Sequence, residues 1–264
     1  MSQTIFGAGG GGKGGGGGRD PKEADDNLNH VQYARIVDLL CEGEIEGIVD
    51  GRKGVFFDNV PLQNPDGTYN FDTTGLDTDF KTGDEDLVNS LKNADEVGAA
   101  VTSGGGLNLT VQKSQPREIA VTDTTVERIR VVLRWQTIQE FKNDGDIEGM
   151  RVQYKFSINN NGGGYSDYVG PGRSSATYTV DGRSADEYLR GHDIHLPSTN
   201  ANGSGWLVRV TRITNDDDSA KKSSAFQIAQ YNLIKTEKLA YYRSAVASIK
   251  ISAEQFGSIP RRSY

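Results

Sequence analysis

Hydrophobic and polar residues alternate along much of the second half of the chain. A period of two is typical of a β-strand that buries one face and exposes the other to water. The clearest case is 151–158, whose apolar positions are Val152, Tyr154, Phe156 and Ile158. Within 127–135 the same pattern places Ile129, Val131 and Leu133 on one face. We therefore expect half-buried strands in both segments.

Further short apolar runs are separated by clusters of Asn, Asp and Gly, which favour turns. The turn clusters are 159–162, 181–182 and 215–218. The runs between and around them are 107–111, 119–121, 176–180, 193–196, 206–214, 227–234 and 245–251. Many short strands at this spacing predict a mainly β chain, with an antiparallel β-sandwich over 107–240.

The first third of the chain is less regular. Residues 31–37 alternate and predict a strand, whereas 38–41 suggest a helical turn and Pro21 suggests another within 19–28. Residues 53–62 predict a hairpin whose turn is Asp58–Asn59, because both residue types tolerate left-handed backbone.

Composition changes this picture at two places. Of the 33 glycines, ten lie between Gly7 and Gly18, and glycine loses the most backbone entropy when it is ordered. Residues 1–18 are therefore expected to be a disordered leader, either a flexible tether or a segment ordered only inside an assembly. Residues 72–97 carry most of the net negative charge, and residues 76–106 are expected to form an acidic, exposed connection.

Charge and cysteine content exclude several classes of protein. The formal net charge is −7, so the chain lacks the basic surface that nucleic acid requires as a main ligand. The single cysteine, Cys41, excludes an internal disulfide and is expected to be a small core residue. No apolar run suggests an export signal or a membrane span, so synthesis in a cytoplasm is expected.

The candidate chemistry is sparse. The three histidines (His30, His192 and His195) are too few for a catalytic zinc centre, and positions 192 and 195 face opposite ways on a strand. The Asp-rich clusters 143–146 and 215–218 lack EF-hand spacing, and the alternating acids Glu42, Glu44 and Glu46 are expected on the surface. We predict no enzyme activity, no metal site and no cofactor.

Sequence phrases near the two ends of the chain carry a family resemblance. After the glycine-rich leader come PKEADDNL at 21–28, LLCEGEIEGIVDG at 39–51 and KGVFFDNVPL at 53–62, and SAEQFGS follows at 252–258. Together they resemble the N-terminal part of the phage tail-tip attachment (host specificity) protein J family of lambda-like long-tailed phages. The matching motif residues, expected to act in structure and assembly, are Glu42, Gly43, Ile45, Glu46, Gly47, Gly51, Glu254, Gln255, Phe256 and Gly257.

The resemblance implies a β-rich hub domain that is interrupted by the sandwich and assembles as a homotrimer in the distal tail of the virion. The expected division is 1–18 leader, 19–75 first hub part, 76–106 connection, 107–240 sandwich and 241–264 return to an incomplete hub. Family members are longer, so we expect a shortened or split product. Its partners would be tail-tip and tail-tube proteins, including the tape-measure protein, and it would reach the host receptor only indirectly.

Two functions are therefore carried forward. The first is a structural subunit of a tail-tip or baseplate hub that takes part in tail assembly, tube closure and connection to host-attachment parts. The alternative is a stand-alone receptor- or glycan-binding sandwich. Its aromatic platforms would be Trp135, Trp206, Tyr165, Tyr168 and Tyr178.

Overall fold

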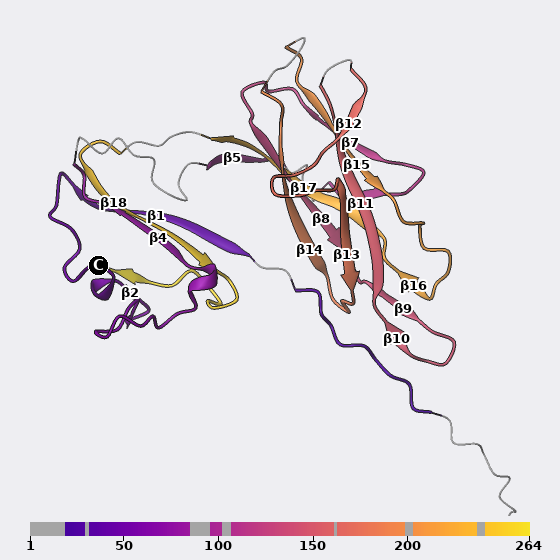
Figure 1. The fold of residues 1–264 in the computed structure, drawn as a ribbon, viewed down its shortest axis with the longest axis horizontal. Helices are drawn as coiled ribbons and strands as arrows, with labels where there is room; N and C mark the ends of the chain where they lie inside the picture. Colours follow the sequence, from indigo (N-terminus) through magenta and orange to yellow (C-terminus); the bar gives the residue numbers. More distant parts are fainter. Residues whose placement is uncertain are drawn as a thin grey trace, which may run out of the picture.

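The computed structural model describes residues 19–29, 32–84, 96–101, 107–160, 163–198, 203–236 and 241–264. Within these ranges the chain is mainly β and contains two short 3-10 helices but no α-helix, which confirms the predicted fold class (Figure 1). Neither 3-10 helix approaches the length and apolarity of a membrane span. The glycine-rich leader lies outside the described residues.

A sandwich of two five-stranded antiparallel sheets forms the larger unit (Figure 1). One sheet has the order β12 (Tyr165–Asp167), β11 (Met150–Asn159), β15 (Trp206–Arg212) and β7 (Arg117–Val121), with β13 (Thr177–Gly182) also paired with β11. The other has the order β14 (Tyr188–His195), β8 (Arg128–Trp135), β17 (Phe226–Thr236) and β5 (Glu96–Val101), with β6 (Leu109–Val111) also paired with β17. A three-stranded sheet of β10 (Ile147–Glu148), β9 (Gln139–Phe141) and β16 (Lys222–Ser223) extends one end.

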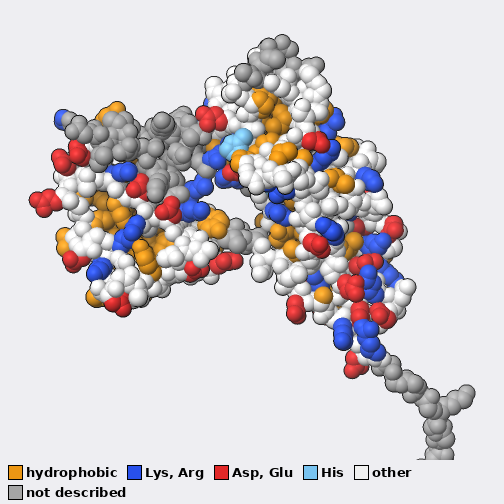
Figure 2. All heavy atoms as spheres, in the orientation of Figure 1, with side chains coloured by type: hydrophobic (Ala, Val, Ile, Leu, Met, Phe, Trp, Pro, Cys, Tyr) orange, Lys and Arg blue, Asp and Glu red, His pale blue; other side chains and the backbone are white. Residues whose placement is uncertain are grey.

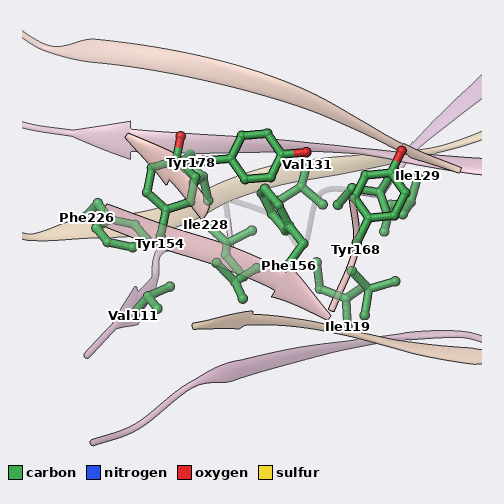
Figure 3. Packing of buried hydrophobic residues seen from close by; sticks show 14 of the residues in the cluster. Val111, Ile119, Ile129, Val131, Tyr154, Phe156, Tyr168, Tyr178, Phe226 and Ile228 are labelled. Atoms are coloured by element: carbon green, nitrogen blue, oxygen red, sulfur yellow. The ribbon is translucent and has the colours of Figure 1, made fainter. Parts of the chain in front are cut away.

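The predicted alternation in β8 and β11 is confirmed. Every second residue of β8, from Ile129 to Trp135, is buried, and so are Val152, Tyr154, Phe156 and Ile158 of β11. Figure 3 shows side chains from several strands of both sheets meeting in one layer. Aromatic rings pack together in this core. Trp135, Tyr154 and Phe226 lie within 6 Å of one another, centroid to centroid.

The smaller unit, here called the base unit, comprises residues 32–84 and 241–264. Its main sheet has the order β1 (Tyr33–Glu42), β18 (Ser244–Ser252) and β4 (Asp77–Lys81). A second sheet joins β19 (Arg262–Ser263), β2 (Phe56–Phe57) and β3 (Val60–Pro61), and the two 3-10 helices are η1 (Gly51–Gly54) and η2 (Thr73–Gly75). Because β18 follows the sandwich but lies between two strands that precede it, the sandwich is an insertion in the base unit.

The hairpin predicted at 53–62 is confirmed. Asp58 and Asn59 adopt left-handed backbone with φ of 49° and 67°, the geometry of a two-residue hairpin turn. They connect β2 to β3, in which Phe57 pairs with Val60. The cluster at 181–182, by contrast, is not a turn, because both residues pair with β11 at the end of β13.

Three further expectations about the first hundred residues are wrong. Residues 38–41 are strand instead of helical turn, because β1 continues along β18 with only a bulge between Leu39 and Cys41. Cys41 is exposed instead of buried. The range 76–106 is not only a connection, since β4 pairs with β18 and β5 pairs with β17.

Residues 19–28 also differ from expectation. They form no helical turn, and they contact the sandwich although they were assigned to the first hub part. Glu23 makes a parallel bridge to Ile147, and the amides of Asn27 and Leu28 donate to the carbonyl of Arg183. Figure 1 shows this segment running along the end of the sandwich. Its hydrogen-bond partners lie more than a hundred residues away, beyond the reach of local sequence patterns.

The two histidines of β14 face opposite ways, as predicted, and His192 is the buried one. Its Nε2 lies 2.8 Å from the hydroxyl of Tyr154, and its ring is packed against the rings of Phe156 and Tyr178. Burial lowers the pKa of His192 to about 3. His192 is therefore a neutral core residue.

This burial predicts a stability that falls with acid. Below pH 6.5 His192 is protonated in the unfolded chain but stays neutral in the folded chain. Unfolding free energy should therefore drop by up to about 1.4 kcal/mol per pH unit from this site as pH falls from 6.5 toward 3. Urea unfolding at several pH values gives the unfolding free energy as a function of pH. Between pH 6.5 and 3 this free energy should change less steeply with pH in His192→Gln than in the wild type. His195→Gln, at an exposed position of the same strand, is the control, and equal slopes for all three chains would contradict the prediction.

Candidate assembly surface

The first motif, residues 42–51, lies beside the two points where the chain passes between the base unit and the sandwich. Glu42 ends β1, and the amide of Gly43 donates to the carbonyl of Arg243 at 2.6 Å. Two residues later, the amide of Ile45 donates to the carbonyl of Thr82 at 2.9 Å. Thr82 follows the last base strand before the sandwich, and Arg243 precedes the first one after it. The motif is therefore hydrogen-bonded to both segments that connect the base unit to the sandwich.

Glycine is required at this junction for conformation and for space. Gly43, Gly47 and Gly51 have φ of 110°, 133° and 60°, values that residues with a side chain rarely adopt. Gly83 approaches the same loop, and a Cβ on it would lie 2.8 Å from the carbonyl oxygen of Gly43. The recurring glycines of the sequence thus have a structural reason.

Gly47→Val should lower the unfolding free energy of the base unit by about 1–2 kcal/mol, because valine resists positive φ. No atom lies within 4 Å of the Cβ position, so the cost comes from backbone conformation and not from a clash. Gly257→Val is the matched control, since Gly257 also has open space but no positive φ. Equal melting temperatures for the two variants would contradict the prediction.

The three alternating acids lie on the surface. Glu42, Glu44 and Glu46 are all exposed, as predicted. Among the described residues there is no group of three or more His, Cys, Asp or Glu side chains placed to hold a metal ion. The carboxylates of this loop are therefore solvated.

The second motif, residues 254–257, lies at the opposite end of the base unit. The Gln255 side chain makes two hydrogen bonds with the backbone of Asp72, accepting from its amide at 2.9 Å and donating to its carbonyl at 2.7 Å. Phe256 packs its ring against Phe57 and Phe71, at centroid distances of 5.8 and 5.3 Å. Glu254 and Gly257 are exposed. This motif therefore fastens the returning chain to the 71–76 segment.

The structure does not bring the two motifs together. In the antiparallel ladder, Glu42 pairs with Ser244 at one end and Tyr33 pairs with Ser252 at the other. Strands rise about 3.3 Å per residue, so the two motifs are separated by the full length of the ladder. They are two separate sets of contacts that hold opposite ends of one sheet, and each such set is called a fastening below.

Sequence reasoning missed a third fastening. Arg262 donates to both carboxylate oxygens of Asp38, and the hydroxyl of Tyr264 donates to the same carboxylate. Hydrogen bonds from Arg262 and Tyr264 lower the pKa of Asp38 despite its partial burial. The prediction of a helical turn at 38–41 concealed the role of Asp38, and nothing in the neighbouring sequence indicated its partners.

Apolar side chains are exposed on the base unit more than on the sandwich. Leu39 and Val49 are 66% and 82% exposed, and both line an open groove of about 710 Å³ together with Ile45, Phe56 and Tyr264. Of the twelve exposed large hydrophobic residues in the described chain, ten belong to the base unit; they are Tyr33, Val37, Leu39, Val49, Val60, Tyr69, Tyr241, Tyr242, Ile259 and Tyr264. Exposed apolar side chains are therefore concentrated on the base unit.

The aromatic platforms of the alternative function are mostly absent from the surface. Trp135 and Trp206 are buried, as are Tyr168 and Tyr178. Tyr165 is partly exposed, but the guanidinium of Arg209 covers its ring at 3.4 Å from the centroid. The four buried residues therefore pack the sandwich, and Arg209 occupies a face of the one ring that is partly exposed.

Comparison with known proteins decides the family. The model of the FNIII-A domain of tip attachment protein J matches residues 101–237, which is just over half of the chain. The chain belongs to the tip attachment protein J family. The domain matched is the sandwich, from the end of β5 through β17.

Two relatives of the protein J family match nearly the whole chain. Tip attachment protein J of Escherichia phage SECphi4 is 31% identical over 246 residues, which is 91% of this chain and 20% of the relative. The protein of the same name from Escherichia phage SECphi27 is 24% identical over 236 residues, covering 89% of this chain and 18% of the relative. The chain therefore spans about a fifth of the length of these relatives.

Proposed function

We propose that this protein is a structural, non-enzymatic subunit of a phage tail tip, located in the distal tail of the virion. The family-model match over residues 101–237 carries the proposal. Both relatives are named as tip attachment proteins of phages. Synthesis would take place in the cytoplasm of the bacterial host.

Within the tail tip, the base unit would act as part of the hub that closes the tube. The base sheet supports this role because it is completed only when the chain returns from the sandwich and β18 enters between β1 and β4. Three fastenings, at Gly43, Gln255 and Asp38, hold this arrangement.

The exposed apolar surface of the base unit supports self-assembly, and we propose a homotrimer. Among the described residues, the apolar core cluster of the base unit has five buried members, namely Val55, Phe57, Leu62, Ile249 and Ile251, and Ala245, Val246 and Ala247 of β18 are buried as well. A core of this size stabilises a domain poorly, and burial of Leu39 and Val49 against a second copy would add apolar contact. Tail-tube, tail-tip and tape-measure proteins are the further proposed partners, and the host receptor would be reached indirectly.

Localisation in the virion tests the proposal. Purified tails would be labelled with an antibody raised against this chain and imaged by electron microscopy. Label at the distal end of the tail is the expected result, and label elsewhere on the particle would refute the proposal. Sedimentation of the purified chain addresses the trimer separately. A monomer at every concentration reached would count against self-assembly of the chain alone.

A further inference from the structure

Residues 22–28 lie on the sandwich as an extended segment, held by backbone hydrogen bonds at both ends. The amide of Ala24 donates to the carbonyl of Ile147 at 2.8 Å, and the amide of Ile147 donates to the carbonyl of Lys22 at 2.9 Å. At the other end, the amides of Asn27 and Leu28 donate to the carbonyl of Arg183 at 3.2 and 3.3 Å. The segment therefore binds as a short added strand, a known mode of peptide recognition.

Arg183 is the centre of this contact. Its side chain is only 6% exposed, and it pairs with the carboxylates of Glu23 and Asp26, the latter at 3.2 Å. It also donates to the carbonyl of Ala24. Each of these acceptors belongs to the segment and none to the sandwich. A nearly buried guanidinium that is neutralised from another part of the chain defines a site for an acidic ligand.

The backbone of the sandwich also contributes hydrogen-bond donors and space for the 22–28 segment. The amide of Arg183 donates to Oδ1 of Asn27 at 2.8 Å, and the amide of Ala185 donates to Oδ1 of Asp26 at 3.1 Å. Gly182 has φ of 155° and lies so close that a Cβ there would sit 2.2 Å from Oδ1 of Asn27. A side chain at position 182 would obstruct the segment.

Charged side chains crowd this end of the sandwich, where Lys, Arg, Asp and Glu alternate on the surface (Figure 2). Arg19 contributes by pairing with Asp146, whose carboxylate also accepts from the amide of Lys22 at 2.7 Å. Only residues 29–32 separate Leu28 from the start of β1. Leu28 and the first residue of β1 are five residue steps apart and can be separated by at most about 18 Å, so the docked segment ties the sandwich closely to the base unit.

We propose that the sandwich carries a binding site for an acidic, extended segment, built around Arg183, and that residues 22–28 fill it as a strap that restrains the sandwich beside β1. The site is separable from its occupant, because the occupant is a single short stretch of chain. The proposal is independent of the function proposed above.

Hydrogen exchange of the full chain tests the strap. In the double variant Glu23→Gln/Asp26→Asn, protection of the Ala24, Asn27 and Leu28 amides should fall on the order of tenfold or more, since charge-assisted bonds to Arg183 are lost. The matched control is Asp20→Asn/Asp25→Asn, which removes the same charge from acids for which the described chain shows no hydrogen bond or ion pair. Unchanged protection in the first variant, or equal loss in both, would overturn the proposal.

A peptide of residues 19–29 tests whether the site is separable. Labelled with a fluorophore, it should bind the full-length Glu23→Gln/Asp26→Asn chain more tightly than the wild type, whose site is filled. Adding Arg183→Ala should abolish that binding, whereas Arg151→Ala, an exposed arginine on the neighbouring strand, should not. Equal binding to all four chains, or no binding to any of them, would refute a separable acidic-segment site.

A distance measurement tests the restraint on the sandwich. Cys41 is exposed on β1 and can carry one spin label, and Val169→Cys on the exposed surface of the sandwich can carry another. The distance distribution should broaden in the Glu23→Gln/Asp26→Asn background and stay narrow in the Asp20→Asn/Asp25→Asn background. Identical distributions in both backgrounds would show that the strap restrains nothing.

Discussion

Trp135→Ala should destabilise the sandwich by about 3–5 kcal/mol, the largest effect expected from one substitution in this chain. Trp135 is fully buried at the end of β8. Its ring lies 5.0 Å from Phe226 and 5.7 Å from Tyr188, centroid to centroid. These neighbours come from the flanking strands β17 and β14, so alanine would leave a cavity across three strands of one sheet.

Urea unfolding followed by circular dichroism measures this loss. Phe141→Ala is the matched control, because Phe141 is a partly exposed aromatic residue on β9 and its truncation should cost less than about 1 kcal/mol. Trp135→Phe retains a ring and should fall between the two. A loss for Trp135→Ala no greater than that for Phe141→Ala would contradict the assignment of Trp135 to the centre of the core.

Phe256→Ala should open the base unit while the sandwich stays folded. The rings of Phe256, Phe57 and Phe71 form a cluster with centroid distances from 5.3 to 5.8 Å. Removing a packed phenylalanine costs about 3–5 kcal/mol in a full core, and the partial exposure of Phe256 places the expected loss near the lower end. Because the base core is small, that loss is a large share of its stability.

Hydrogen exchange resolves this effect by region. The amides of Ile249 and Ile251 in β18 should exchange faster in Phe256→Ala, and those of Val131 and Tyr154 in the sandwich should not change. Ile259→Ala, at an exposed position three residues away, should alter neither set. Faster exchange throughout the chain would show instead that the two units unfold together.

The predicted strands rest on local physics. In β11, Tyr154 and Phe156 could be assigned to the core from their spacing alone, because a strand places alternate side chains on opposite faces. The Asp58–Asn59 turn could be predicted for a similar reason, since the residues themselves favour the backbone that the turn requires. Both predictions depend on a few neighbouring residues and on no distant partner.

The candidate site was only partly predictable. The residues of both motifs were identified from the resemblance, yet their partners, Asp72, Thr82 and Arg243, were not. Gln255 reaches Asp72 across 183 positions of sequence, and no composition or period indicates such a pair. The Asp38 fastening was missed for the same reason, because Arg262 and Tyr264 lie at the other end of the chain.

The sequence by itself determined that the chain is mainly β, which faces of its clearest strands are buried, and where glycine separates the leader from the rest. Those properties follow from side-chain period and backbone preference. Only the tertiary structure decided that β18 enters between β1 and β4 and that residues 19–28 bind the sandwich instead of the base unit. Strands of similar pattern satisfy local preferences beside many partners. The choice among them is made by long-range contacts such as those of Arg183 and Gln255, which form only in the folded chain.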